Sequence, residues 1–436
     1  MLTNPEKLKR INVYTFGCAK NLVDSEKLMG ALRASACIVV HESPLQKGDL
    51  VVVNTCGFIN DAKQESINAI LEFAEQKNTG EIDGLFVYGC LSQRYKEELL
   101  KEIPEVDNYF GINSIKEIIE KMGLSFKDHL LGERFLSTPG HYAYLKISDG
   151  CDQKCSFCAI PLIKGKHKSV PDQELITESR KLVDQGVREL ILVAQDSTYY
   201  GLDLYGQRRL FKLMDSLSSI KGLEWLRLQY TYPSSFPLEI LDLMNDRGNI
   251  CRYLDIPLQH ISDPVLKKMR RGINARKSRE LIETIRTKVP EIALRTTFLV
   301  GHPGESDADF EELLDFVEEV KFDRLGVFTF SPEENTYSYG LKNVVPPGIR
   351  EERAQQLMSV QQNISLERNN QKIGTTCKVL IDRKEGHYFT GRTEFDSPEV
   401  DNEVFVEDHK KLAIGSFYSV EITGAGYFDL YGKALG

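Results

Sequence analysis

The chain has 436 residues, of which 41% are hydrophobic and 27% are charged, and its net charge is −9 at pH 7. This composition is typical of a globular protein, and the length predicts two or three domains. No apolar run reaches about 18 residues and the first ten residues lack a secretory signal, so we expect a cytoplasmic protein without a membrane partner. The acidic balance disfavours an extended nucleic-acid track but leaves room for a local basic patch.

Residues 8–130 alternate short apolar strands with amphipathic helices. The strands are predicted at residues 11–16, 49–54 and 84–88. The helices that follow them are predicted to begin at Asp24 or Ser25, at Asn60 or Asp61, and at Ser92. Strands and helices in alternation predict an open parallel sheet.

One cysteine follows each of these strands by one or two residues, namely Cys18, Cys56 and Cys90. Because the carboxyl ends of parallel strands share one edge of a sheet, the three thiols are predicted to converge there. Each has a neighbouring glycine that lets the backbone come close, namely Gly17, Gly57 and Gly89. Three such placements favour an iron–sulfur cluster. The alternative is that each cysteine is a small buried side chain.

Residues 140–335 repeat the strand and helix pattern six times. The strands are predicted at residues 143–148, 189–195, 224–230, 253–258, 293–300 and 324–330, and the helices include residues 173–184 and 307–320. This repetition predicts a βα-barrel or partial barrel, with an active site at the carboxyl ends of its strands.

A run of three cysteines, Cys151, Cys155 and Cys158, follows the first strand of the predicted barrel. Three thiolates at spacings of four and three can bind three irons of a cubane cluster and leave the fourth iron open. The odd total of nine cysteines disfavours a disulfide framework. Structural zinc is the stronger alternative, but it requires a fourth Cys or His at a short spacing, and the nearest downstream histidine is His167.

Polar side chains also stand at the carboxyl ends of the other barrel strands. They are Gln195, Asp196, Gln259, His260, Thr297 and the turn from Gly301 to Glu305. Each alone is a common loop residue, but their shared placement predicts a ligand site at this edge.

The last part of the chain is predicted to be a small barrel reached through a connector helix. The helix is predicted at residues 351–371, and five short strands are predicted at residues 377–381, 388–393, 403–406, 418–423 and 427–430. Such strands are typical of an antiparallel OB-like barrel. Residues 371–436 contain eight Lys and Arg against eleven Asp and Glu, a net charge of −3. We interpret this excess as an acidic surface that favours a basic protein partner over tRNA.

The cysteine run, with Phe157 before its last cysteine, resembles the C-x3-C-x-aromatic-C signature of the radical S-adenosylmethionine (SAM) superfamily. The complete order of segments resembles the methylthiotransferase family over essentially the whole chain. The resemblance implies an N-terminal methylthiotransferase domain at residues 1–135, a radical SAM core with the connector helix at residues 136–370, and a TRAM domain at residues 371–436.

The resemblance also implies two 4Fe-4S clusters and two uses of SAM. The cluster on Cys151, Cys155 and Cys158 is expected to generate a 5'-deoxyadenosyl radical, which abstracts hydrogen from an unactivated carbon. The cluster on Cys18, Cys56 and Cys90 is expected to hold sulfur, accept a methyl group and deliver methylthio. No acid–base pair is required, because such a C–H bond has no useful acidity. The SAM contacts are expected among Phe157, Gln195, Asp196, Gln259, Thr297 and Glu305.

The family has two main kinds, MiaB-like enzymes that modify a tRNA adenosine and RimO-like enzymes that modify an aspartate of protein twelve of the small ribosomal subunit. The chain resembles the RimO type in its stretches at residues 15–26, 253–260 and 294–301. It departs from the usual pattern at His302, where Phe is usual, and at Lys164, where Arg is usual; the lysine keeps the charge but loses a bidentate fork.

We therefore expect an enzyme that methylthiolates the β-carbon of an aspartate in the small-subunit protein and receives electrons from a donor such as flavodoxin. We do not expect tRNA to be a partner. Two alternatives stay open: a MiaB-like tRNA methylthiotransferase, and a non-catalytic iron–sulfur protein that senses redox state. Cleavage of SAM after dithionite reduction separates the second alternative from an enzyme.

Overall fold

The computed structural model describes residues 9–35, 37–126, 134–407 and 411–435. The chain forms two compact units. The first consists of Met1–Ser137 with Ala159–Lys166, and the second of Thr138–Cys158 with His167–Gly436. None of the helices in the described ranges is long and apolar enough to span a membrane.

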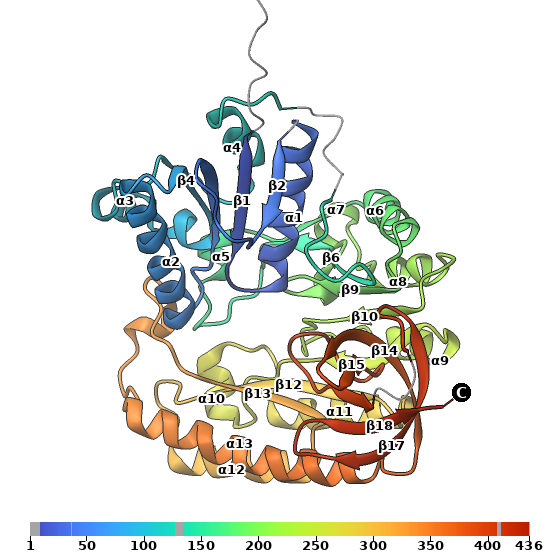
Figure 1. Ribbon diagram of the computed structural model, residues 1–436. Helices are drawn as coiled ribbons and strands as arrows, with labels where there is room; N and C mark the ends of the chain where they lie inside the picture. Colours follow the sequence, from blue (N-terminus) through green and yellow to red (C-terminus); the bar gives the residue numbers. More distant parts are fainter. Residues whose placement is uncertain (1–8, 36, 127–133, 408–410, 436) are drawn as a thin grey trace, which may run out of the picture. The chain divides into compact units, whose positions relative to one another are not determined.

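The first unit contains a five-stranded parallel sheet in the order β2-β1-β3-β4-β5, which confirms the predicted open sheet (Figure 1). Its strands are β1 (Arg10–Thr15), β2 (Ile38–His41), β3 (Asp49–Thr55), β4 (Ile82–Gly89) and β5 (Asn108–Tyr109). Its helices are α1 (Ala19–Ala34), α2 (Asn60–Asn78), α3 (Cys90–Glu102), α4 (Ile115–Lys121) and α5 (Ile160–Lys164).

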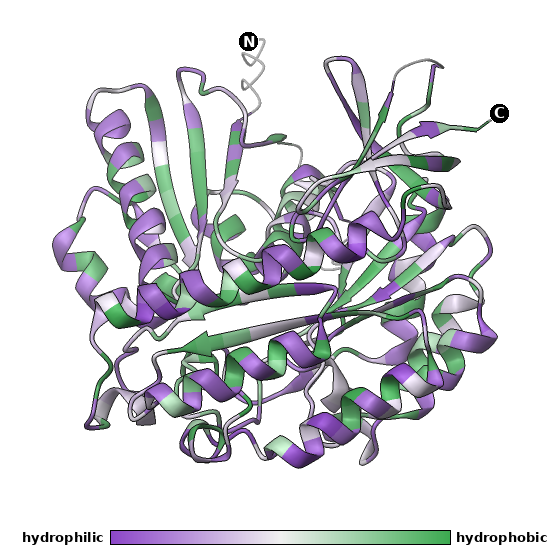
Figure 2. Ribbon diagram, turned by 90° about the horizontal axis from the view of Figure 1, so that it is seen from below, coloured by the Kyte–Doolittle hydropathy of each residue, from purple (hydrophilic) through white to green (hydrophobic). Residues whose placement is uncertain are grey.

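Both faces of this sheet are buried. Val52 of β3 belongs to one hydrophobic cluster, whereas its neighbours Val51 and Val53 belong to another. Successive side chains of a strand point to opposite faces, so a strand covered on both sides is apolar throughout. Figure 2 shows green segments along strands of the molecule and both purple and green turns on its helices.

Two helices of this unit begin earlier than predicted. α1 begins at Ala19 rather than at Asp24 or Ser25, and α3 begins at Cys90 rather than at Ser92. The reason is that Cys18 and Gly89 themselves occupy the N-cap positions, so almost no chain separates strand from helix. As a result, Cys18 and Cys90 lie at helix N-termini.

The second unit contains a six-stranded parallel sheet in the order β13-β12-β11-β10-β9-β6, the predicted partial barrel. Its strands are β6 (Tyr142–Lys146), β9 (Glu189–Val193), β10 (Trp225–Leu228), β11 (Ile250–Asp255), β12 (Ala293–Val300) and β13 (Arg324–Thr329). A separate antiparallel pair is formed by β7 (Ser148–Asp149) and β8 (Lys168–Ser169).

The helices of this unit follow the strands in regular alternation (Figure 1). They are α6 (Asp172–Asp184), α7 (Leu202–Tyr205), α8 (Leu210–Ser218), α9 (Glu239–Asp246), α10 (Asp263–Met269), α11 (Ala275–Lys288), α12 (Asp307–Val320) and α13 (Pro347–Asn370), with short 3-10 turns η2 (Ser197–Tyr199) and η3 (Tyr337–Gly340). The connector α13 begins at Pro347, ahead of the predicted start, because proline suits the first turn of a helix.

A closed five-stranded barrel in the order β14-β15-β16-β18-β17 completes this unit, as predicted. It is not wholly antiparallel, because β16 and β18 pair in parallel. Its strands are β14 (Thr376–Glu385), β15 (Tyr388–Arg392), β16 (Val404–Glu407), β17 (Phe417–Ala425) and β18 (Leu430–Ala434). The last strand was predicted at residues 427–430, but β18 begins only at Leu430. The reason is a turn in which the Gly426 N–H donates to the Asp429 carbonyl.

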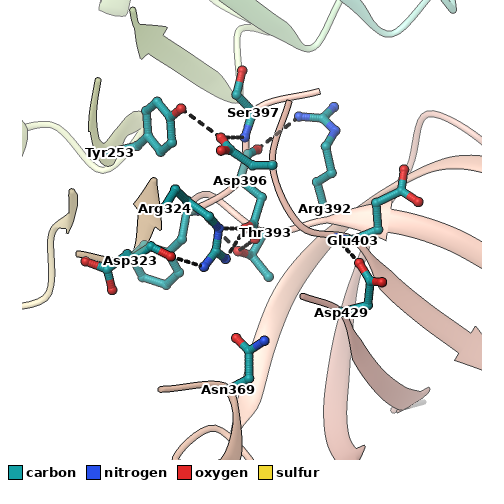
Figure 3. Close-up of polar contacts among 12 residues, drawn as sticks. Tyr253, Asp323, Arg324, Asn369, Arg392, Thr393, Asp396, Ser397, Glu403 and Asp429 are labelled. Atoms are coloured by element: carbon teal, nitrogen blue, oxygen red, sulfur yellow. Dashed lines mark hydrogen bonds and ion pairs between the residues drawn. The ribbon is translucent and has the colours of Figure 1, made fainter. Parts of the chain in front are cut away.

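The loop between β15 and β16 anchors the barrel to the core sheet (Figure 3). Asp396 pairs with Arg324, the first residue of β13. Asp401 accepts hydrogen bonds from Tyr253 of β11 at 2.7 Å and from Arg295 of β12 at 3.2 Å. The barrel therefore contacts the core through buried ion pairs that involve several of its strands.

These contacts correct the interpretation of the acidic surface. Asp382, Asp396 and Asp401 are buried in ion pairs with Arg392, Arg324 and Arg295. Without these three acids and Arg392, residues 371–436 carry seven basic and eight acidic side chains, of which Lys410 and Asp408 lie outside the described residues. The excess is therefore only −1, because charges counted from a sequence include those that are neutralised inside the fold.

Candidate iron–sulfur sites

The loops that carry Cys18, Cys56 and Cys90 meet at one edge of the first sheet. They follow β1, β3 and β4, which are neighbours in the sheet. A Cβ built on Gly17 would lie 2.9 Å from the Sγ of Cys56, and one built on Gly57 would lie 2.7 Å from the Cα of Leu91, the residue after Cys90. Any larger residue at either glycine would push the loops apart.

Asn21 holds these loops together from the first turn of α1. Its Nδ2 donates to the carbonyls of Phe16 at 3.0 Å and Thr55 at 3.2 Å, and its Oδ1 accepts from the Cys90 thiol at 3.7 Å. Asn21 is almost fully buried. Sequence reasoning did not single out this residue, although it lies inside the RimO-type stretch at residues 15–26.

The three thiols differ in acidity. Burial raises the pKa of Cys90 to about 12, and Cys18 and Cys56 contribute to this rise. Desolvation would also raise the pKa of Cys18, but Lys20 and the backbone N–H groups of Asn21 and Lys20 outweigh it and lower this pKa. Cys18 is therefore the thiol that ionises most readily.

Lys164 brings a positive charge to the same site. Its side chain is buried within the first unit and its ammonium lies 3.4 Å from a carboxylate oxygen of Asp24. This charge lowers the pKa of both Cys18 and Cys90, against the larger effect of desolvation. The lysine found here in place of the usual arginine thus keeps an electrostatic role beside the thiols.

Three thiols at one edge of the sheet are a donor set that a cubane cluster can use. Within the described ranges, no three Cys, His, Asp or Glu side chains are grouped so that they could hold a single ion. In a cubane each thiolate binds a different iron, so the sulfur atoms need not surround one point. All nine cysteines lie in the described part of the chain, and none of them forms a disulfide.

The second set, Cys151, Cys155 and Cys158, lies in the loop between β7 and β8. The Cys158 N–H bonds the Cys155 carbonyl at 3.2 Å, and the Ser156 N–H bonds the Met269 carbonyl at 3.0 Å. Burial raises the pKa of Cys151 to about 12. Iron bound at this thiol would favour its ionised form.

A buried hydroxyl network fixes this cysteine loop. Ser338 of η3 donates its N–H to the Ser156 carbonyl, and the two hydroxyls lie 2.8 Å apart. The Nε2 of His302 lies 2.8 Å from the Ser338 hydroxyl, and its ring is edge-on to Phe157 and Phe330. The unusual histidine therefore fits a pocket that is polar on one side and aromatic on the other.

The remaining predicted SAM contacts fall into two groups. Gln195, Gln259 and Thr297 lie at or near the carboxyl ends of their strands, and the Oε1 of Gln195 is buried without a hydrogen-bond partner in the described structure. Phe157 packs against the cluster of Val265, Met269, Leu299 and Phe330.

Asp196 and Glu305 are instead held by protein groups. Asp196 accepts from Gln153 at 2.8 Å and caps η2 through Thr198. Glu305 accepts from the N–H groups of Gly301 and His302 and from Arg353 at 2.6 Å. Their carboxylates shape the loops at this edge, and their contact with SAM stays a prediction.

His302 should make stability depend on pH. Burial lowers its pKa to about 4, so the unfolded chain binds a proton below about pH 6.5 that the folded chain does not. We expect the free energy of unfolding to fall by about 2 kcal/mol between pH 7.5 and pH 5 through this group. His302→Phe should remove that part of the fall in urea titrations, whereas His387→Phe, at an exposed site, should not. Parallel pH profiles for the parent and His302→Phe would contradict this role.

Three families match successive parts of the chain. Residues 10–111 match the uncharacterized protein family UPF0004, residues 145–317 match the radical SAM superfamily, and residues 373–435 match the TRAM domain. The radical SAM match implies SAM and a 4Fe-4S cluster.

Curated relatives match almost the whole chain. A protein of Cytophaga hutchinsonii named ribosomal protein uS12 methylthiotransferase RimO is 53% identical over 98% of each chain. A Porphyromonas gingivalis protein of the same name is 52% identical over 98% of this chain and 99% of its own.

Solved structures agree on the fold. The radical SAM methyltransferase TsrM from Kitasatospora setae, with tryptophan substrate and a SAM analogue bound, has a TM-score of 0.55 at 14% identity and covers 82% of this chain and 89% of its own. At this identity the likeness concerns the fold alone. The similarity to the curated relatives extends over almost the complete chain, and it shows that the chain belongs to the RimO family of radical SAM methylthiotransferases.

Proposed function

We propose that the chain transfers a methylthio group to the β-carbon of an aspartate in ribosomal protein uS12, with two 4Fe-4S clusters and SAM. The observation that carries this proposal is the presence of two separate sets of three cysteines. The first set follows three strands of a parallel sheet, and the second lies in the β7–β8 loop that comes after β6, the first strand of the other parallel sheet, so both occur where such folds place their ligands. The family of the chain supports the same activity.

The two sets of cysteines have separate roles in this proposal. Cys151, Cys155 and Cys158 hold the cluster at which SAM supplies a carbon-centred radical. Cys18, Cys56 and Cys90 hold the cluster that supplies the methylthio group. Gln195, with its unpartnered oxygen, is the best supported SAM contact, and Gln259, Thr297 and Phe157 lie near enough to the strand ends to join it.

The proposal keeps the three domains at residues 1–135, 136–370 and 371–436, a flavodoxin-like electron donor and a cytoplasmic location. It does not include tRNA as a partner. The acidic excess of the barrel now gives this choice little support, because most of it is paired inside the fold. The choice of the ribosomal protein over tRNA rests instead on the RimO-type stretches and on the names of the relatives.

Iron content tests the two sites directly. Anaerobically reconstituted protein should bind about eight irons per chain, and Cys18→Ala with Cys56→Ala should leave about four, because each cubane holds four. Cys37→Ala is a matched control in the same unit and should keep about eight. A double variant that still binds eight irons would remove the N-terminal site from the proposal.

The substrate is tested by offering both candidates to one preparation. With SAM and a one-electron reductant, mass spectrometry should detect one added methylthio group on an aspartate of uS12 and no change in unmodified tRNA. Modification of the tRNA but not of uS12 would replace this proposal with the MiaB-like alternative. If SAM is cleaved when neither substrate is present, the alternative of a non-catalytic redox-sensing protein is excluded.

A further inference from the structure

Arg271 lies directly against a cysteine of the barrel set. It follows the end of α10, is only 4% exposed, and its Nη1 donates to the Sγ of Cys155 at 3.2 Å. Its Nη2 donates to the Pro257 carbonyl at 2.6 Å. The guanidinium carbon lies 4.3 Å from the ring centre of Tyr232, whose hydroxyl bonds the Arg271 carbonyl at 2.7 Å. The arginine is thus held on three sides.

The charge of this arginine is not balanced by a carboxylate. Among the residues that the structure describes, none forms an ion pair with Arg271, and Asp196 acts on it only from a longer range. Its Nε is buried without a hydrogen-bond partner in the same described set. Burying an unpaired ion costs several kcal/mol, so the fold requires an anion at this position.

We infer that Arg271 is the counter-cation of the cluster on Cys155 and its two partners, and that it raises the reduction potential of this cluster. The inference rests on the proposed placement of a cluster at these cysteines. A cubane with three thiolate ligands is anionic, and it gains one further negative charge when a one-electron donor reduces it. A guanidinium hydrogen-bonded to a ligand sulfur stabilises the reduced form more than the oxidised form.

Reduction in this scheme changes only the charge of the cluster. One electron passes from a low-potential donor, such as dithionite or a flavodoxin, to an iron of the cluster, and no bond to Arg271 forms or breaks. The arginine is therefore a positioning and tuning residue. Replacing it should therefore change the reduction potential of the cluster, and this change can be measured without turnover.

The test is a redox titration of the full-length, reconstituted protein followed by electron paramagnetic resonance. Arg271→Met removes the charge at a similar length, and Arg271→Lys keeps the charge without the planar fork. Arg270→Met is the matched control, because Arg270 is the exposed neighbour and stacks on Tyr337 instead, with 3.6 Å to the ring centre. Repeating each titration with Cys18→Ala and Cys56→Ala assigns the signal to the barrel cluster.

At the midpoint potential of the parent, Arg271→Met should lower the ratio of reduced to oxidised barrel cluster by about tenfold, a shift of about 59 mV for one electron. Arg271→Lys should fall between the parent and Arg271→Met, and Arg270→Met should stay within about twofold of the parent. Iron analysis of every variant distinguishes a failure of the inference about Arg271 from a failure of the proposed cluster site. A parent protein that lacks the barrel irons would refute the cluster site.

The inference is overturned if Arg271→Met keeps its irons and titrates within about twofold of the parent. If Arg271→Met does not retain the cluster, Arg271→Gln, which also removes the charge, decides by the same criterion. Loss of the cluster from both variants also overturns it, because Arg271 would then serve assembly rather than potential.

Discussion

Replacing Cys155 with alanine should abolish both the formation of 5'-deoxyadenosine and the methylthiolation of uS12, each by more than about a thousandfold. Replacing Cys56 should abolish methylthiolation to the same extent but leave reductive cleavage of SAM largely intact. The reason is that Cys155 lies in the radical SAM loop, whereas Cys56 lies in the first unit on a different sheet. Chromatography of the nucleoside product and mass spectrometry of uS12 measure the two steps separately.

Each of these variants has a matched control. Cys37 lies in the first unit and Cys377 in the C-terminal barrel, and both are partly exposed and belong to neither set. Cys37→Ala and Cys377→Ala should retain both activities. A Cys155→Ala protein that still forms 5'-deoxyadenosine would show that the radical arises elsewhere, and a Cys56→Ala protein that still methylthiolates uS12 would remove the second cluster from the reaction.

Replacing Asp396 with alanine should lower the free energy of unfolding by about 3–5 kcal/mol, because the buried guanidinium of Arg324 would lose its partner. Desolvation would raise the pKa of Asp396, but Arg324 and Lys372 outweigh it and hold this pKa below its usual range. The pair therefore stabilises the fold above about pH 4 and is lost as the pH falls further. Urea denaturation at pH 7.5 measures the effect.

A double-mutant cycle shows whether this loss comes from the unpaired arginine. Asp396→Ala combined with Arg324→Met should be more stable than Asp396→Ala alone, since no buried charge remains unpaired. Glu421→Ala, at an exposed position of the same barrel, should stay within about 0.5 kcal/mol of the parent. If Asp396→Ala and Glu421→Ala are equally stable, the barrel does not depend on this ion pair.

Strand periodicity predicted much of the fold because it reflects burial directly. The run Leu50-Val51-Val52-Val53 is apolar because β3 is covered on both faces. The short edge strands β2 and β5 were missed, since few of their residues are buried and the pattern is correspondingly weak. The convergence of Cys18, Cys56 and Cys90 followed from a rule of parallel sheets and needed no knowledge of side-chain contacts.

Residue type alone could not show which polar side chains at the predicted SAM edge are already held by protein groups. Glu305 and Gln195 both lie at the edge that was predicted to bind SAM, but only the glutamate has a complete set of protein partners. Arg271 was not predicted at all, because its contact with Cys155 joins residues that are 116 positions apart. The acidic count of the barrel failed for the same reason, since the partners of Asp396 and Asp401 lie outside that segment.

The junction between barrel and core also affects how the chain matures during synthesis. Arg227 of β10 donates to the carbonyl of Glu394, 167 residues later, and Glu189 pairs with both Arg227 and Arg392. The partner of Arg324 in β13, Asp396, also comes later in the chain. A ribosome therefore releases the core strands before the barrel residues that complete these buried contacts. A prematurely terminated chain would expose these charges and be open to proteolysis, so a radical-forming core should not accumulate in the cell without the rest of the enzyme.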